Sequence, residues 1–188
     1  MDGYERLTTL IESAWEEWNG ANAGNGDLSL DAIGDVLETG LLTPHDAERT
    51  VERLVAVALA DVGHGARESA LHAICTASVH HELPYRVVEP LAVGADAFEP
   101  LLLEYVLGIL GATHDRAALP VVERYLRHPH PEVRREAADA VYELHWSPER
   151  RDSTGRGHLP PTRDAHAVCD EDPESGAERM MGIRKPLT

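Results

Sequence analysis

A pattern of five apolar positions occurs three times along the chain, with offsets of 0, 4, 7, 8 and 11 residues each time. The three sets are Ala66, Ala70, Ala73, Ile74 and Ala77; Phe98, Leu102, Tyr105, Val106 and Ile109; and Val133, Ala137, Ala140, Val141 and Leu144. These offsets place the five side chains on one face of an α-helix. The sets begin 32 and 35 residues apart, which is the length of a two-helix repeat.

A second apolar pattern repeats in the segments that precede these helices. Two groups of three residues match at an offset of 34: Val87, Val88 and Leu91, then Val121, Val122 and Tyr125. Leu54, Val55 and Ala58 fit the same positions one repeat earlier. We therefore predict three helical hairpins, over residues 44–79, 84–110 and 115–145, separated by glycine and proline.

The first 43 residues are predicted to cap this array. Apolar spacing indicates a helix over residues 3–19, followed by a glycine- and asparagine-rich loop over 19–27. A short helix is expected over 29–39, with Ser29 as its N-cap and Gly40 as its stop. Thr43 and Pro44 then provide a cap and a first-turn proline for a helix expected over 44–62.

Residues 147–188 differ in composition from the rest, with five prolines and mixed charge without a period. We expect a poorly ordered extension. The alternative is a strap that docks along the helices through apolar anchors. The candidate anchors are Leu159, Val168, Met180, Met181, Ile183 and Leu187.

The stretch HPHPEVRREAADAVYEL resembles the second helix of a HEAT-like repeat. The residues on the positions typical of that family are Val133, Arg134, Ala137, Ala138, Ala140 and Leu144. The first copy has Ala66 for the valine, and the second departs most, with Phe98, Glu99 and Pro100. Over residues 44–146, the resemblance implies an all-α, right-handed solenoid of three HEAT-like hairpins. Most HEAT-like proteins are adaptors, scaffolds or inhibitors; a minority are enzymes acting on phycobilins, deoxyhypusine or alkylated DNA bases.

The chain of 188 residues is acidic, with a net charge of −16. The acids concentrate at the start, where residues 1–62 hold 13 Asp and Glu against 3 Arg. No basic stripe of the kind that binds nucleic acid is visible, and anionic membrane surfaces are disfavoured for the same reason. A partner protein with a basic surface would be attracted, although many acidic proteins simply use their charge for solubility.

The cysteine pattern and the N-terminus are typical of a cytoplasmic protein. Cys75 and Cys169 form no disulfide framework. The first residues carry acids where a signal peptide carries bases, and no apolar run is long enough to span a membrane.

Histidine is the first candidate for metal chemistry, with 11 in the chain. A metal site needs three or four convergent ligands, and neither an HExxH nor a CxxC motif occurs. Phosphate-binding glycine loops and a GxSxG elbow are also absent from the sequence. Cys75 has His72 three residues before it on the same predicted helix, but that helix face carries no further acid to orient the histidine. We therefore expect no metal, no cofactor and no catalytic residues.

The resemblance to HEAT-like repeats implies that the second helices line a concave face. The repeat register then places His72, Glu104 and Asp139 in one row, Glu68 and Arg135 in another, and Cys75, Leu107 and Tyr142 in a third. These rows combine charge with apolar and aromatic anchors, as interfaces do. They also suit an ordinary solvated face. We predict partner binding through His72, Glu104, Asp139, Glu68, Arg135, Leu107 and Tyr142.

The sequence therefore favours a non-enzymatic protein-binding module: an adaptor, regulator or inhibitor. One alternative is an immunity-type protein that neutralises a basic toxin or nuclease. Another is a small helical-repeat enzyme of lyase, hydroxylase or DNA-base excision type.

Overall fold

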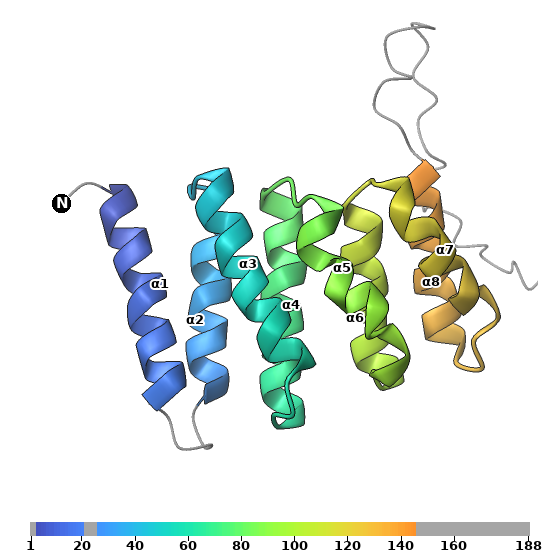
Figure 1. Ribbon diagram of the computed structural model, residues 1–188, viewed down its shortest axis with the longest axis horizontal. Helices are drawn as coiled ribbons and strands as arrows, with labels where there is room; N and C mark the ends of the chain where they lie inside the picture. The colour runs from blue at the N-terminus through green and yellow to red at the C-terminus, as the bar shows by residue number, and fades with distance from the viewer. Residues whose placement is uncertain (1–2, 21–25, 146–188) are drawn as a thin grey trace, which may run out of the picture. The chain divides into compact units, whose positions relative to one another are not determined.

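Eight α-helices and three short 3₁₀ turns make up the regular structure of the residues that the computed structural model describes, 3–20 and 26–145 (Figure 1). No strand occurs within these ranges, which confirms the all-α prediction. The helices are α1 (Gly3–Gly20), α2 (Gly26–Glu38), α3 (Pro44–Leu59), α4 (His64–His80), α5 (Tyr85–Val93), α6 (Pro100–Ala112), α7 (Leu119–Val122) and α8 (Pro131–His145). The 3₁₀ turns are η1 (Ala95–Ala97), η2 (Arg116–Ala118) and η3 (Glu123–Arg127).

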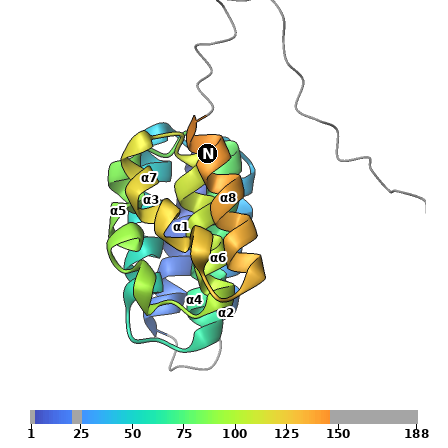
Figure 2. The same cartoon turned by 90° about the vertical axis from the view of Figure 1, so that its right-hand side faces the viewer.

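The helices of the described ranges pack in two layers (Figure 2). One layer contains α2, α4, α6 and α8, and each of these helices contacts the next. The other layer contains α3, α5 and the stretch from η2 to η3, which pack against α4, α6 and α8 respectively. Helix α1 packs against α2. The hydrophobic core lies between the layers and includes Leu54, Leu71, Leu91 and Leu110, all fully buried.

Capping residues define the connection between α2 and α3, as predicted. Gly40 follows α2 with a φ of +64°, a left-handed conformation that glycine adopts without the steric cost of a Cβ. The Thr43 hydroxyl accepts a hydrogen bond from the Asp46 amide at 3.2 Å, and Pro44 occupies the first turn of α3. Gly40 therefore ends α2, and Thr43 with Pro44 begins α3 a few residues later.

The repeated apolar pattern identifies the core. Thirteen of its fifteen side chains are buried; Tyr105 and Val141 are half-buried and pack against the core. Phe98 is buried but lies before α6, contrary to the prediction that it shares a helix with Leu102. The reason is Pro100, which restricts the preceding Glu99 to an extended conformation and so starts the helix after it.

Two predicted helix boundaries are wrong by three residues each. Helix α2 begins at Gly26 rather than at 29, so Ser29 lies inside the helix and is buried on the same face as Ile33 and Val36. Helix α3 ends at Leu59 rather than at 62, because Ala60 is extended and closes the last turn with a hydrogen bond from its amide to the Val57 carbonyl.

The first helix of the predicted third hairpin is broken into η2, α7 and η3. Pro120 has no amide hydrogen to continue a helix from the preceding turn. Even so, Val122 and Tyr125 are buried at the positions that the repeat predicts. The periodic apolar pattern therefore predicts burial here better than it predicts helix type.

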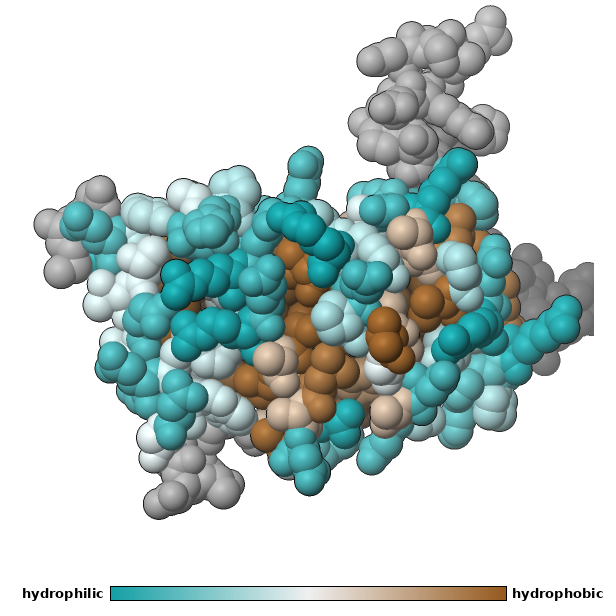
Figure 3. Space-filling model, viewed as in Figure 1, coloured by the Kyte–Doolittle hydropathy of each residue, from teal (hydrophilic) through white to brown (hydrophobic). Residues whose placement is uncertain are grey.

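The face formed by α3 and α5 carries much of the visible apolar surface (Figure 3). Leu59, Val93 and Leu126 of this layer are exposed, Val93 to 82%. The residues predicted to bind a partner lie instead on α4, α6 and α8. The predicted extension over 147–188, its strap alternative and Cys169 lie outside the described residues.

Candidate partner-binding face

The candidate face consists of the outward side chains of α2, α4, α6 and α8. The repeated apolar positions of these helices point into the core. The positions between them are therefore the ones that a partner could contact. The spacing between neighbouring helices in this layer therefore decides whether the face is flat or hollowed.

In two of the three helix–helix contacts within this layer, α2–α4 and α6–α8, small residues let the backbones approach closely. A Cβ added at Gly34 of α2 would lie 3.3 Å from the Ala73 Cβ on α4. A Cβ added at Gly111 of α6 would lie 2.9 Å from both Cα and Cβ of Ala140 on α8. Ala73 and Ala140 occupy the same position of the repeat, at offset 7. A glycine facing an alanine thus brings these backbones into close contact.

Between α4 and α6 the arrangement differs, because the offset-7 position of α6 is Tyr105. Its phenol ring meets the His72 ring edge-on, with centroids 6.2 Å apart and an interplanar angle of 90°. A shallow hollow of about 350 Å³ opens beside this pair. The lining residues come from α2, α4 and α6: Asp31, Gly65, Glu68, Ser69, His72 and Tyr105.

The hollow is negatively charged. Within the described ranges, Asp31 forms no ion pair or hydrogen bond, and Glu68 has only a 3.8 Å contact with His64 Nε2. Arg67, which precedes Glu68 on α4, points elsewhere: it donates from Nε to the Ala58 carbonyl at 3.1 Å and lies over the Phe98 ring. Burial, and then the Glu68 charge, raise the pKa of Tyr105, so its hydroxyl stays protonated. Two carboxylates beside an aromatic ring form a suitable receptor for a cationic side chain.

A second group of carboxylates lies on α8. Its members are Glu136, Asp139 and Glu143, spaced three and four residues apart on one side of the helix. Burial raises the pKa of Glu136, and the charges of Asp139, Glu143 and Glu104 raise it further. Burial likewise raises the pKa of Glu143. A Cβ at Gly108 or Gly111 would meet a carboxylate oxygen of Glu136 or Glu143, respectively, at 2.8 Å, so these carboxylates lie directly over the two glycines of α6.

The seven predicted binding residues divide between these two places. His72 and Glu68 line the hollow. Glu104 and Asp139 lie close enough to Glu136 for their charges to raise its pKa. Arg135 is exposed on α8 and acts in the opposite direction on that pKa. Tyr142 is 55% exposed on the same helix.

Leu107 is wrong as a binding residue. Its side chain is fully buried, so it cannot contact a partner on this surface. The register placed it in a row with Cys75 and Tyr142, but α6 is apolar on nearly all sides and both layers cover it. A strictly repeated register therefore misplaces a residue where the helix has no polar side.

Cys75 is half-buried on α4. Burial raises the pKa of its thiol, and the charges of Glu136 and Glu143 raise it further. The thiol is therefore a poor nucleophile at neutral pH.

Sequence reasoning missed Asp31, Tyr105, Glu136 and Glu143 as site residues. Glu136 and Glu143 had a usable signal, because they lie three and four residues from Asp139. Tyr105 was predicted to be core because it fits the apolar pattern. Its position in the hollow depends on the spacing between α4 and α6, which the pattern alone does not specify.

The histidines of the described ranges do not converge on one point. His128 and His130 stack in the turn before α8, with ring centroids 5.5 Å apart. Over residues 3–20 and 26–145, no group of three or more His, Cys, Asp or Glu side chains could hold a metal ion. Across the same residues, every helix is too short or too polar to cross a membrane.

The chain matches no protein-family model, and no curated protein sequence matches it. Its function must therefore be argued from the geometry of the face itself.

Proposed function

We propose that this protein is a non-enzymatic binding module whose α2, α4, α6 and α8 face receives a basic segment of another protein. In this proposal the helices form a short, right-handed HEAT-like solenoid, with α1 and α2 as its N-terminal cap. The paired contacts α3–α4 and α5–α6, and the contacts of η3 and α7 with α8, support that interpretation.

The observation that carries the proposal is the hollow beside Tyr105. It offers two carboxylates, Asp31 and Glu68, without an arginine or lysine to neutralise them in the described ranges. It also offers a half-buried aromatic ring. An arginine or lysine inserted there would gain charge-assisted hydrogen bonds and contact with the ring. An anchor residue surrounded by weaker contacts is typical of protein interfaces.

The carboxylates of α8 extend this acidic surface beyond the hollow. Glu136, Asp139 and Glu143 of α8, together with Glu104 of α6, would attract the rest of a basic segment and accelerate its encounter. The immunity-type alternative is the particular case in which the partner is a basic toxin or nuclease. It shares the same face and the same charge requirement.

The experiment measures binding of a fluorescent peptide of alternating arginine and leucine to the full chain by anisotropy. We expect saturable binding that weakens as salt rises, because exposed charges are screened. The same peptide with citrulline in place of arginine keeps the size and loses the charge. It should bind at least about tenfold more weakly if cations are the anchors.

The variant Asp31→Asn/Glu68→Gln empties the hollow of charge and should weaken binding by roughly tenfold or more. The matched control, Glu52→Gln/Asp61→Asn, removes the same charge at exposed positions on or beside α3. The triple change His72→Ala/Glu104→Gln/Asp139→Asn tests the wider face. Equal affinity of the hollow variant and its control would contradict the proposal.

A further inference from the structure

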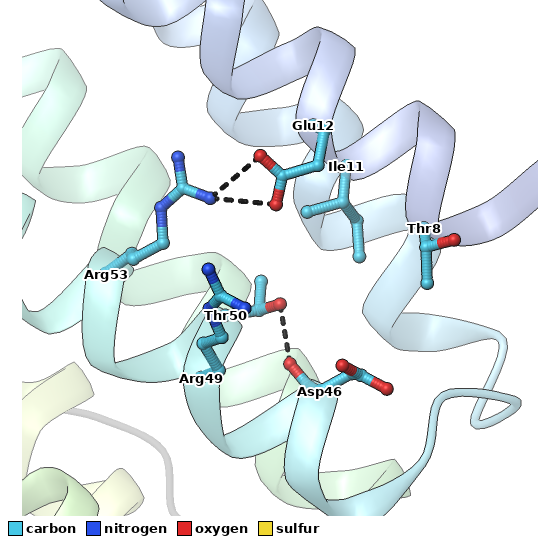
Figure 4. A pocket seen from close by; sticks show the side chains of 7 residues that line it. All are labelled: Thr8, Ile11, Glu12, Asp46, Arg49, Thr50 and Arg53. Carbon is cyan, nitrogen blue, oxygen red and sulfur yellow. Dashed lines mark hydrogen bonds and ion pairs between the residues drawn. The ribbon is translucent and has the colours of Figure 1, made fainter.

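A second hollow, of about 180 Å³, lies between α1 and α3 (Figure 4). Long polar side chains bridge these two helices. The Tyr4 hydroxyl donates to Asp46, and Arg53 Nη1 contacts Glu12 Oε1 at 3.2 Å. The lining residues are Thr8, Ile11, Glu12, Asp46, Arg49, Thr50 and Arg53.

Two guanidinium groups are directed from α3 toward α1 at this place (Figure 4). Arg49 and Arg53 are one helical turn apart, so they project from the same side of α3. Arg53 is held in position because it lies over the Trp15 ring, 4.1 Å from the centroid, and pairs with Glu12. Arg49 forms no hydrogen bond or ion pair with any residue that the structure describes, although its charge helps to lower the pKa of Asp46.

Most of the other polar groups of this hollow form hydrogen bonds within the protein. Hydrogen bonds from the Thr43 and Tyr4 hydroxyls lower the pKa of Asp46, and both of them engage its Oδ2 oxygen. The Thr50 hydroxyl donates to the Asp46 carbonyl at 2.7 Å, and the Thr8 hydroxyl donates to the Glu5 carbonyl at 3.1 Å. The donors left over are the N–H groups of Arg49 and those that Arg53 does not give to Glu12. These free donors favour a ligand that accepts hydrogen bonds.

These two arginines lie in the most acidic part of the chain. Residues 1–62 contain only 3 Arg against 13 acids, and two of the three arginines line this one hollow. The lining itself is balanced, because Glu12 and Asp46 offset Arg49 and Arg53. A monoanion fits that balance better than a dianion, which would face uncompensated repulsion from the surrounding acids.

We propose that this hollow binds a small monocarboxylate, with the carboxylate oxygens accepting hydrogen bonds from Arg49 and Arg53. The planar guanidinium matches the planar carboxylate. The Ile11 side chain supplies an apolar wall for a short alkyl group. The volume is below the 300–1,000 Å³ that is typical of pockets for larger ligands, so the acid is of a few carbon atoms. This site is separate from the proposed partner-binding hollow and shares no residue with it.

The test is a titration of the ¹⁵N-labelled full chain with sodium butyrate, followed by amide chemical shifts. We expect saturable shifts at residues of α1 and α3 that line the hollow, with smaller affinity for acetate, which has less alkyl surface to bury. Sodium chloride at the same ionic strength should produce no saturable shifts. Inorganic phosphate should bind more weakly than butyrate; phosphate binding as tight as butyrate binding would overturn the monocarboxylate assignment.

Arg49→Gln is the deciding variant, because it removes a guanidinium that holds no ion pair within the described ranges. It should weaken butyrate binding by about tenfold, as expected for the loss of charge-assisted hydrogen bonds. Arg6→Gln removes the same charge from an exposed position of α1 outside the hollow and should leave affinity unchanged. Butyrate shifts that do not saturate, or that survive Arg49→Gln undiminished, would overturn the proposal. Thermal unfolding of each variant establishes that both chains remain folded.

Discussion

The contact between α6 and α8 and the contact between α4 and α6 use the same repeat position but have opposite structures. At α8 this position is Ala140, and Gly111 faces it so closely that an added Cβ would lie 2.9 Å away. At α6 it is Tyr105, which meets the imidazole of His72 and borders a hollow. The first pair of helices is closed by small residues, and the second is held apart by two rings.

This difference shows how a repeat can acquire a binding site without losing its fold. The apolar face stays in register in both places and the core remains continuous. The changes lie at the edge of the apolar face, where a phenol replaces the methyl group and His72 replaces the facing glycine. A larger side chain at that edge separates the outer rims of two helices while their inner faces stay packed.

The largest expected effect on stability comes from forcing α6 and α8 apart at Gly111. Gly111→Val places a branched side chain against the backbone of Ala140, which cannot move without shifting α8. We expect a loss of about 3 kcal/mol of unfolding free energy, measured by urea unfolding. Gly108→Ala is the matched control, because its Cβ would meet only the mobile carboxylate end of Glu136. It should be neutral or slightly stabilising, since alanine is the better helix former.

A smaller effect is expected from removing the ring that borders the hollow. Tyr105→Ala should cost about 1–2 kcal/mol, less than a fully buried aromatic residue, because the tyrosine is only half-buried. Thermal unfolding measures the loss. The exposed Tyr142 provides the comparison, and Tyr142→Ala should cost less than about 0.5 kcal/mol. Equal losses for the two tyrosines would show that Tyr105 contributes no packing between α4 and α6.

The smallest expected effect on stability comes from Glu136, a carboxylate of α8 that lies against α6. Burial raises the pKa of Glu136, so the folded protein holds this proton to a higher pH than the unfolded chain does. Stability therefore falls as pH rises from the ordinary glutamate range through the raised pKa, and the penalty is complete at neutral pH. Glu136→Gln should raise stability at neutral pH by less than about 1 kcal/mol.

That gain should disappear below about pH 4, where the carboxylate is protonated in both states. Urea midpoints at the two pH values measure it. Glu132→Gln removes the same charge from an exposed position in the first turn of α8. It should be slightly destabilising at neutral pH, because the helix N-terminus favours an acid. A gain of equal size for both variants would mean that total charge, and not burial of Glu136, is responsible.

Much of the fold follows from local signals in the sequence. The apolar offsets predict the buried face of α4 and α8, and Thr43, Pro44 and Gly40 predict where α3 begins and α2 ends. Errors arise where a proline acts through the backbone. Pro100 excludes Phe98 from α6, and Pro120 interrupts the helix expected before η3. Such effects change helix boundaries while the burial of the apolar side chains persists.

Less of the candidate face could be predicted, because it depends on distances between helices. The repeat register assigns His72 and Glu68 to one side of α4, where they line the hollow. It cannot reveal that Leu107 is covered, because that depends on how completely the neighbouring helices surround α6. It also cannot reveal that Tyr105 borders a hollow, since the same apolar residue would be core if α4 lay closer.

The half-buried thiol of Cys75 offers a native probe of motion in this layer. Its raised thiol pKa and its position on α4 make alkylation slow while the helices are closed. Each transient separation of α4, α6 and α8 would expose the sulfur to reagent and to water. The alkylation rate of the peptide containing Cys75 therefore reports the frequency of local opening, without an introduced label.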